Sequence, residues 1–306
     1  MNNSGQLTRR HNMKKGSIVI CASILCVFLM SGSGMAQETA KRFTLKVSGG
    51  YGSISGGDVT TIADGLNELL MDIARLAGGT TSGSIENAKW GPEFEGEFVY
   101  NITDRFGVGL GVGYIRKSID SKAELQAGTL ARVSFECEPA YKVVPITLSG
   151  YYTLPVASKM NAFFKAGAGY YFATWDYKIR EETELFGKTV WSENEGTAKD
   201  NGFGFHGGLG LEYSISGSVA LFVEGTGRYV NLKDWDVDYL YQDAFGSERD
   251  TGTFWYIEEY EEDTGKYYPY LGVGDEEPSG PGIKNARKAE ISLSGVVFKL
   301  GVKFRF

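Results

Sequence analysis

Side chains that commonly carry catalysis are scarce in this chain. It contains two histidines, and only His206 lies beyond the N-terminal segment that we expect to be removed. His206 could act as a base for a serine or a water, but no serine stands next to it in its His-Gly-Gly segment. We therefore expect His206 to pair with a carboxylate inside the fold. The sequence predicts a protein that is not an enzyme and needs no cofactor.

Charged residues recur at every second position within several apolar segments. This alternation places apolar residues on one face of a strand and charged residues on the other. If the apolar faces meet lipid, the opposite faces share a lumen, where charges persist only in pairs. The residues predicted to form this lumen network are Lys46, Glu93, Glu95, Glu97, Lys165, His206, Glu212, Glu224, Arg228, Lys299 and Lys303.

Glycines share the inward positions with these charges, most regularly in residues 106–116. Because the two signs of charge are evenly matched, the expected interior is a salt-bridged plug in a barrel that side chains just fill. The glycines leave two alternatives open. They could leave a narrow wet path for solutes, or they could ease the strong coiling of a small barrel.

The strands that must position these residues follow from the alternation with period two. About eight segments have roughly the ~9–11 residues that a tilted membrane strand needs. They are residues 43–51, 93–102, 106–116, 144–154, 162–173, 202–213, 220–230 and a last strand that ends at Phe306. The sequence thus predicts an all-β fold, a transmembrane antiparallel up-and-down barrel. Pro145 cannot donate to a ladder, so we expect it near the outer rim, at a bulge.

The last predicted strand also carries an assembly signal. Large apolar residues alternate with charged or small ones up to the final phenylalanine. This pattern resembles the C-terminal signature of bacterial outer-membrane proteins, which the barrel-assembly machinery reads. The residues of the signal are Phe298, Leu300, Val302, Phe304 and Phe306.

The N-terminus has the order of a secretory signal peptide over residues 1–36. Basic residues precede an apolar run, and small residues follow up to Ala36, after which we expect cleavage. Met13 opens a typical signal sequence by itself and is the predicted true start. Cleavage leaves a barrel domain over residues 37–306, in which Cys137 is the lone cysteine, and the loss of four cations and no anion changes the formal net charge from −7 to −11. A chain this acidic is a poor partner for nucleic acid.

Loop lengths predict the orientation of the barrel. The connections after the second, fourth and sixth predicted strands are short, and the others are long. Outer-membrane barrels have short periplasmic turns and long extracellular loops, so both termini are expected in the periplasm. The acidic connection between the fifth and sixth strands is predicted to be a hairpin that extends them.

The first long loop contains a predicted short helix over residues 58–77. Apolar residues recur there at helical spacing, with acidic residues on the other side. Helices that lie on anionic membranes are rich in basic residues, so we expect this acidic helix to cap the barrel mouth. Contact with the membrane is the alternative.

The last loop, about residues 231–290, is rich in acidic and aromatic residues. Asp234, Asp236 and Asp238 would share one face of an extended arm, where they could bind a hard cation. The expectation for this loop is a solvated hairpin arm whose charges repel one another, and the cation site is the alternative. Aromatic side chains are enriched at recognition sites, and the predicted ligand-binding residues are Trp235, Tyr239, Tyr241, Trp255, Tyr256 and Tyr260.

Four features resemble the small outer-membrane β-barrels of the OmpA, OmpX and OmpW type: residues 144–152, 165–170 and 202–210, and the terminal Phe306. The resemblance implies an eight-stranded barrel with a role in envelope integrity, adhesion or small-molecule passage, and supplies no catalytic residues. We expect a structural or surface-interaction role carried by the external loops. The expected partners are outer-membrane lipid and lipopolysaccharide, the barrel-assembly machinery and an extracellular ligand. A narrow channel for small or hydrophobic solutes and an outer-leaflet lipid-modifying enzyme are the alternatives.

Overall fold

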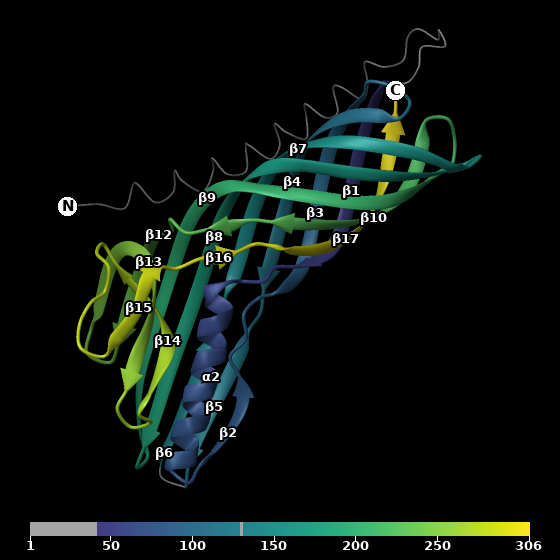
Figure 1. Ribbon diagram of the computed structural model, residues 1–306. Coiled ribbons are helices and arrows are strands. Elements are labelled where there is room, and N and C mark those ends of the chain that lie inside the picture. The colour runs from purple at the N-terminus through teal and green to yellow at the C-terminus, as the bar shows by residue number, and fades with distance from the viewer. Residues whose placement is uncertain (1–41, 129–130) are drawn as a thin grey trace, which may run out of the picture. The chain divides into compact units, whose positions relative to one another are not determined.

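Eight antiparallel strands close into a barrel in the computed structural model, which describes residues 42–128 and 131–306 (Figure 1). These strands are β1 Phe43–Ser53, β3 Trp90–Asn101, β4 Phe106–Ser118, β7 Ala140–Ala157, β8 Met160–Leu185, β9 Lys188–Ser214, β10 Val219–Tyr229 and β17 Gly295–Arg305. They pair in that order around the ring, and β17 pairs with β1 to complete it. The predicted all-β barrel is confirmed. The predicted signal peptide and its cleavage position lie outside the described residues.

The outer face of the barrel is apolar and the inner face is not. In β4, Val108, Leu110 and Val112 are 42%, 59% and 53% exposed, while the glycines between them face inward. In β1, Thr44 and Lys46 are buried between exposed apolar residues. A strand with these two faces forms a wall between lipid and a filled lumen. Among the described residues, no helix is both long enough and apolar enough to cross a membrane.

Strands β8 and β9 continue together beyond the barrel, where further strands join the same sheet. We call this part of the sheet, with the helix packed on it, the extension. The two strands are 26 and 27 residues long and remain paired as far as Leu185 and Lys188. The hairpin predicted for this acidic connection is therefore confirmed. The added strands are β2 Thr80–Ser84, β5 Ser121–Ala127, β6 Ala131–Cys137, β12 Asp236–Asp243, β13 Ser247–Glu261, β14 Lys266–Gly274 and β15 Ile283–Lys288, besides the short pair β11 Asn231–Leu232 and β16 Ile291–Ser292.

The sheet of the extension curls around the helix α2 (Asp58–Leu76). Its strand order is β2, β5, β6, β8, β9, β12, β13, β14, with β15 on β13. The helix contacts β14 at one edge of this sheet and β2 and β5 at the other. The predicted helix is thus confirmed, but the prediction that it caps the barrel mouth is wrong. It runs away from the mouth along the extension (Figure 1) because Ala63, Leu70 and Ala74 are buried against that sheet.

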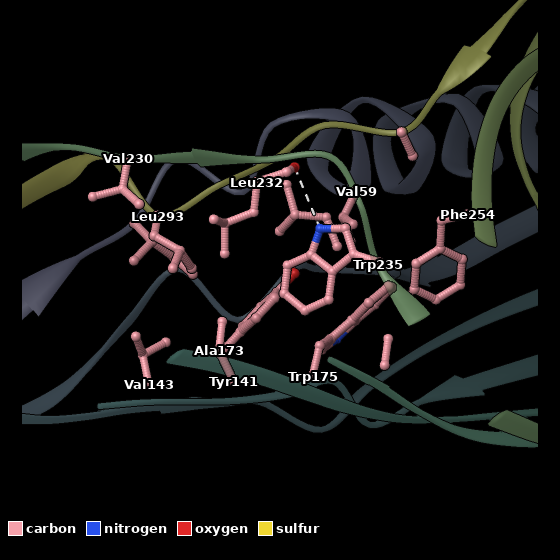
Figure 2. Close-up of a cluster of buried hydrophobic side chains, with 14 of the residues drawn as sticks. Val59, Tyr141, Val143, Ala173, Trp175, Val230, Leu232, Trp235, Phe254 and Leu293 are labelled. Atoms are coloured by element: carbon pink, nitrogen blue, oxygen red, sulfur yellow. Dashed lines mark hydrogen bonds between the residues drawn. The ribbon is translucent and has the colours of Figure 1, made fainter. Parts of the chain in front are cut away.

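The prediction that the last loop is a solvated arm is wrong, because the loop forms ordered strands of this sheet. Trp235, just before β12, is 0% exposed and packs in the cluster that contains Val59, Trp175 and Phe254 (Figure 2). Its indole Nε1 donates a hydrogen bond to the Leu232 carbonyl at 3.3 Å. Burial of so many aromatic rings supplies the apolar area that a charged hairpin arm would lack.

Pro145 lies within β7 without the predicted bulge. The register between β4 and β7 is the same on both sides of it, and the one irregularity in the β7–β8 ladder falls between Pro155 and Ala157. The ring of Pro145 points toward Gly113, where a β-carbon would lie 3.0 Å from Pro145 Cγ. A glycine on the neighbouring strand, rather than a bulge, accommodates the proline.

Candidate functional site

Lys46 occupies the centre of the barrel lumen. Its ammonium group lies 3.1 Å from a carboxylate oxygen of Glu97 and 3.1 Å from one of Glu224, and it donates to the Tyr151 hydroxyl at 2.7 Å. The three partners come from β3, β10 and β7. All four side chains are buried, so one cation joins four strands where an unpaired charge would be very costly.

Two further lysines connect Lys46 to its neighbours. Lys165 lies 2.7 Å from Glu224 and 3.4 Å from Glu95. Lys299 pairs with Glu95 as well. Because Glu224 binds both Lys46 and Lys165, these pairs form one network in the middle of the lumen.

Ion pairs also fill both ends of the lumen. At the end that carries the extension, Glu93 lies 2.7 Å from Lys117 and 2.6 Å from Arg228. At the other end, Glu212 lies 2.6 Å from Lys303. The structure therefore brings the charged residues of the predicted set into the lumen and gives each one a partner of opposite sign.

The inward glycines make room for large side chains from neighbouring strands. A β-carbon on Gly109 would lie 2.4 Å from Glu97 Oε1, and one on Gly210 would lie 2.3 Å from the Phe163 ring. Acidic and aromatic side chains occupy the space beside Gly109 and Gly210, whereas a β-carbon on Gly167 or Gly208 would lie 2.0 or 2.7 Å from a backbone oxygen of a neighbouring strand. These side chains fill space that a wet path would need, and the role of the glycines in the coiling of the barrel stays a prediction.

His206 has a different partner from the one predicted. Its Nε2 lies 2.9 Å from the Ser149 hydroxyl, and its Nδ1 is buried without a hydrogen-bond partner. The expectation of a carboxylate partner is wrong because the ladder places His206 beside the small inward residues of β7 and β8 rather than beside an acid.

The lumen also contains residues that the sequence pattern did not identify, among them Lys117, Ser149 and Tyr151. The signal that could have found them is the parity of each strand. Lys117 continues the inward glycine positions of β4, and Ser149 and Tyr151 share the inward face of β7. Lys117 is 0% exposed, which makes it one of the most deeply buried charges in the barrel.

A small cavity remains beside His206. Its volume, counted as space for the centres of water molecules, is about 40 Å³, and Glu95, Thr147, Lys165 and Lys299 line it. At ~10–15 Å³ per water it has room for about three or four waters. Thr147 Oγ1 and His206 Nδ1 are buried without a hydrogen-bond partner, and neither atom is accessible to water.

The family of the chain follows from a comparison with known proteins. The model of the family described as outer membrane protein beta-barrel domain matches residues 22–253. The chain belongs to this family. The protein is thus an outer-membrane barrel of bacteria, as its strand pattern and C-terminal strand predicted.

Three solved structures are similar to this outer-membrane barrel over most of its length. OprG from Pseudomonas aeruginosa is 12% identical, with a TM-score of 0.38 over 89% of this chain and 99% of its own. Neisserial surface protein A is 12% identical, with a TM-score of 0.36 over 86% and 97%. A major outer membrane protein from Thermus thermophilus is 14% identical, with a TM-score of 0.40 over 86% and 99%. No curated protein sequence matches the chain.

The contact between Ser149 and His206 of the outer-membrane barrel is of the kind that activates a serine nucleophile. A hydrolase also needs room for its substrate next to the serine. Ser149 is 1% exposed, and the cavity beside His206 is too small for an acyl chain. The pair is a hydrogen bond that links β7 to β9 across β8 on the lumen side.

The aromatic residues predicted to bind a ligand do not share one surface. Trp235 is fully buried, and Trp255 and Tyr256 are each 8% exposed. Only Tyr241 and Tyr260 are well exposed, at 39% and 42%, whereas Tyr239 is half-buried and packs against the main cluster. Trp235, Tyr239 and Tyr256 pack in or against the main hydrophobic cluster of the extension. Trp255 points to the other face of β13, where its Nε1 donates to the Gly274 carbonyl.

The three aspartates of the predicted cation site do not face a common site. Two of them pair with basic side chains of the protein, and the third is exposed to solvent. Asp234 pairs with Lys288, and Asp238 lies 2.7 Å from Arg249, which holds the pKa of that carboxyl below its usual range. Asp236 is exposed on β12. Within residues 42–128 and 131–306, no three acidic, histidine or cysteine side chains are arranged to hold a metal ion.

The helix α2 is fastened to the last loop near both of its ends. Asp58 accepts two hydrogen bonds from Arg287, at 2.6 and 2.7 Å. Asp72 accepts from Lys266 at 2.6 Å and from the Tyr268 hydroxyl at 2.8 Å. These hydrogen bonds lower the pKa of Asp72. The extension is thus an ordered structure whose helix and strands are joined by buried acids.

Proposed function

We propose that this outer-membrane barrel is a non-enzymatic scaffold with a lumen closed to solutes and an extension that has a surface-interaction role. The observation that best supports closure is that buried ion pairs occupy the lumen along its whole length. Glu93 pairs with Arg228 at one end, and Glu212 pairs with Lys303 at the other. Lys46 and its partners occupy the middle. A solute would have to separate these charges in an environment where unpaired charge is very costly.

The extension is proposed to lie outside the cell. At the opposite end of the barrel, β3 joins β4, β7 joins β8 and β9 joins β10 through only a few residues each. Outer-membrane barrels have their short turns in the periplasm. An epitope inserted at Gly246, in the open turn between β12 and β13, should be detected by antibody on intact cells. An epitope in the turn between β9 and β10 should need permeabilised cells, and the reverse result would overturn this orientation.

Closure is tested by swelling of liposomes that contain the refolded barrel. The proposal predicts that glycine, glucose and neutral oligosaccharides enter no faster than they enter empty liposomes. Swelling that depends on the size of the solute would show a narrow channel, which is the leading alternative. Folding is checked in the same samples by heat-modifiable migration in gels. A sample without swelling then counts as evidence for closure only if its barrel is folded.

A further inference from the structure

Two cations lie next to each other on the outer face of the barrel, Arg116 on β4 and Lys142 on β7. They are opposite each other in the β4–β7 register. Both are exposed, whereas Lys117 and Tyr141, which follow and precede them in the chain, are buried in the interior. The side chains of this pair therefore point away from the lumen, toward the medium that surrounds the barrel.

The pair lies at the end of the lipid-facing band on both strands. The outward positions within residues 106–114 of β4 and 144–152 of β7 carry no charge. Arg116 follows Phe106, the first residue of this band on β4, by ten residues. A rise of ~3.3 Å per residue gives ~33 Å along the strand, and a tilt of ~35–45° reduces this to a height of roughly 23–27 Å. The apolar band of a membrane barrel is ~25 Å tall, so the pair lies where the lipid headgroups begin.

Aromatic side chains surround the pair at this level. Tyr114, the outward residue before Arg116 on β4, is 39% exposed. Trp90 on β3 is 52% exposed and stacks on Tyr51. The residue after it, Gly91, is so close to β4 that a β-carbon there would lie 2.3 Å from the Arg116 carbonyl oxygen. Tyrosine and tryptophan rings are typical of the boundary between acyl chains and headgroups, so the groups that meet the pair are lipid headgroups.

The chain does not balance the charges of this pair. Lys142 lies 2.5 Å from Asp176 on β8, whose other carboxylate oxygen accepts a hydrogen bond from Thr197. The Arg116 side chain has no ion pair and no hydrogen bond with any of the described residues. Like charges directly opposite each other on neighbouring strands are destabilising. An anion that binds both cations would replace this repulsion by attraction.

We infer that Arg116 and Lys142 form a binding site for the phosphate group of a membrane lipid. Arginine binds phosphate through two parallel hydrogen bonds, and lysine binds it as a point charge. The pair lies at the end of the barrel that carries the extension. By the orientation proposed above, the lipid then belongs to the outer leaflet, where lipopolysaccharide carries phosphate. The inference goes beyond the proposed scaffold role, and only the choice of leaflet rests on that orientation.

The test measures which lipid gathers beside Trp90. The mature chain is refolded into phosphatidylcholine vesicles that contain a small share of phosphatidic acid brominated near the glycerol or, in parallel, of phosphatidylcholine brominated at the same place. Bromine quenches tryptophan fluorescence on contact, and the other tryptophans are buried or lie in the extension. Phosphatidic acid should quench at a mole fraction roughly fivefold lower, because one basic side chain near the membrane surface contributes about that factor.

The net charge of the chain works against this result, since an acidic protein would by itself repel phosphatidic acid. A preference for this lipid therefore requires a local site. Equal quenching by the two lipids would overturn the inference. Trp90→Phe should remove the quenching by both lipids, which verifies that the signal comes from the outer face of the barrel.

Three variants test the two cations. The double substitution Arg116→Gln and Lys142→Gln should make the two lipids equal, whereas Arg116→Lys, which keeps the charge, should retain most of the preference. Arg105→Gln, in the exposed turn at the other end of β4, is the matched control and should leave the preference unchanged. A preference that survives the double substitution would overturn the site. If the double variant does not fold, Arg116→Gln alone should lower the preference severalfold, and an unchanged preference would overturn the site equally.

The same vesicles distinguish a lipid from free phosphate as the ligand. Millimolar inorganic phosphate should leave the preference unchanged relative to chloride of equal ionic strength, because a lipid in the bilayer is present at a high effective concentration. Loss of the preference in inorganic phosphate alone would show that the site binds the free ion, and would overturn the assignment to lipid.

The outcome is independent of lumen closure. Conductance through the barrel would overturn the scaffold proposal without affecting the quenching of Trp90. Equal quenching by the two lipids around a closed barrel would overturn the lipid site and leave the scaffold proposal in place.

Discussion

The Lys46 ammonium group donates to the Tyr151 hydroxyl at 2.7 Å, although β1 and β7 stand three places apart in a ring of eight strands. A contact of this kind can form only if the side chains cross the lumen. Glu97 binds both residues, and Glu224 binds Lys46 from the other side. The centre of the barrel is therefore a packed, ion-paired core, which supports the proposal that the lumen is closed to solutes.

Replacing Lys46 by methionine should destabilise the barrel strongly. The substitution keeps much of the volume but leaves Glu97 without its cation, and removal of one partner of a buried ion pair typically costs ~3–5 kcal/mol. Urea unfolding in lipid vesicles, followed by tryptophan fluorescence, measures the change. Lys159→Met, in the exposed turn between β7 and β8, is the matched control and should change the free energy of unfolding by less than ~0.5 kcal/mol. Equal effects of the two variants would show that the central network does not stabilise the barrel.

Gly65→Ala should destabilise the extension, although alanine normally favours a helix over glycine by ~0.5–1 kcal/mol. A β-carbon at Gly65 would lie 2.2 Å from Pro269 Cγ, so α2 could not stay seated on β14. Overpacking of this kind costs ~1–3 kcal/mol. Proteolysis of the extension measures it, with Gly246→Ala, at a position with open space, as the control. Stabilisation by Gly65→Ala would contradict the packing of α2 described above.

The attachment of α2 at Asp72 should weaken in acid. Because the folded state lowers the pKa of Asp72, its contribution to stability is fully present above about pH 4, the ordinary range of an aspartate, and is lost as pH falls through the lowered value. At pH 7, Asp72→Asn should increase hydrogen exchange in α2 severalfold, and the difference from the unaltered chain should vanish in strong acid. Asp64→Asn, on the exposed side of the same helix, should have no such effect. A difference in hydrogen exchange that persists in strong acid would show that the ionised carboxylate of Asp72 is not what holds α2.

Trp235→Ala should destabilise the extension, whereas Tyr241→Ala should not. The indole of Trp235 is fully buried, while Tyr241 is 39% exposed. Truncation of a buried tryptophan typically costs ~3–5 kcal/mol. Thermal unfolding of the two variants, compared with hydrogen exchange in β12 and β13, measures the contrast. Similar small losses of stability in both variants would indicate a loosely packed arm. The aromatic rings would then again be candidates for ligand binding.

The barrel was predictable from the sequence because each strand needs an apolar residue toward lipid and a small or polar residue toward the lumen, and this need repeats at every second residue. The alternation of Val108, Leu110 and Val112 with glycine identifies a wall with lipid on one side, and the same parity assigns Lys46 and Glu224 to the lumen. The helix followed in the same way from its spacing. Its bounds were correct to one residue at the C-terminal end.

The extension was not predictable in the same way. Its core depends on contacts between segments far apart in the chain, such as Trp235 with Val59 and Trp175, and local patterns cannot show which faces will meet. A run of acids and aromatics therefore resembles a solvated arm until its partners are known. The pairing of His206 with Ser149 also depends on which strands are neighbours in the barrel. The same holds for Pro145, which fits into β7 because Gly113 lies beside it on β4.

The central claim, a closed lumen, is tested most directly by the single-channel conductance of the refolded chain, residues 37–306, in planar bilayers. Because Lys46 binds Glu97, Glu224 and Tyr151 across the lumen, we expect no discrete current steps. The protein tested must migrate as a folded barrel. A triple substitution of Lys46, Tyr151 and Glu224 by alanine, if it folds, should produce steps because it removes the side chains that cross the middle. Steady, discrete steps from the unaltered protein would contradict the account.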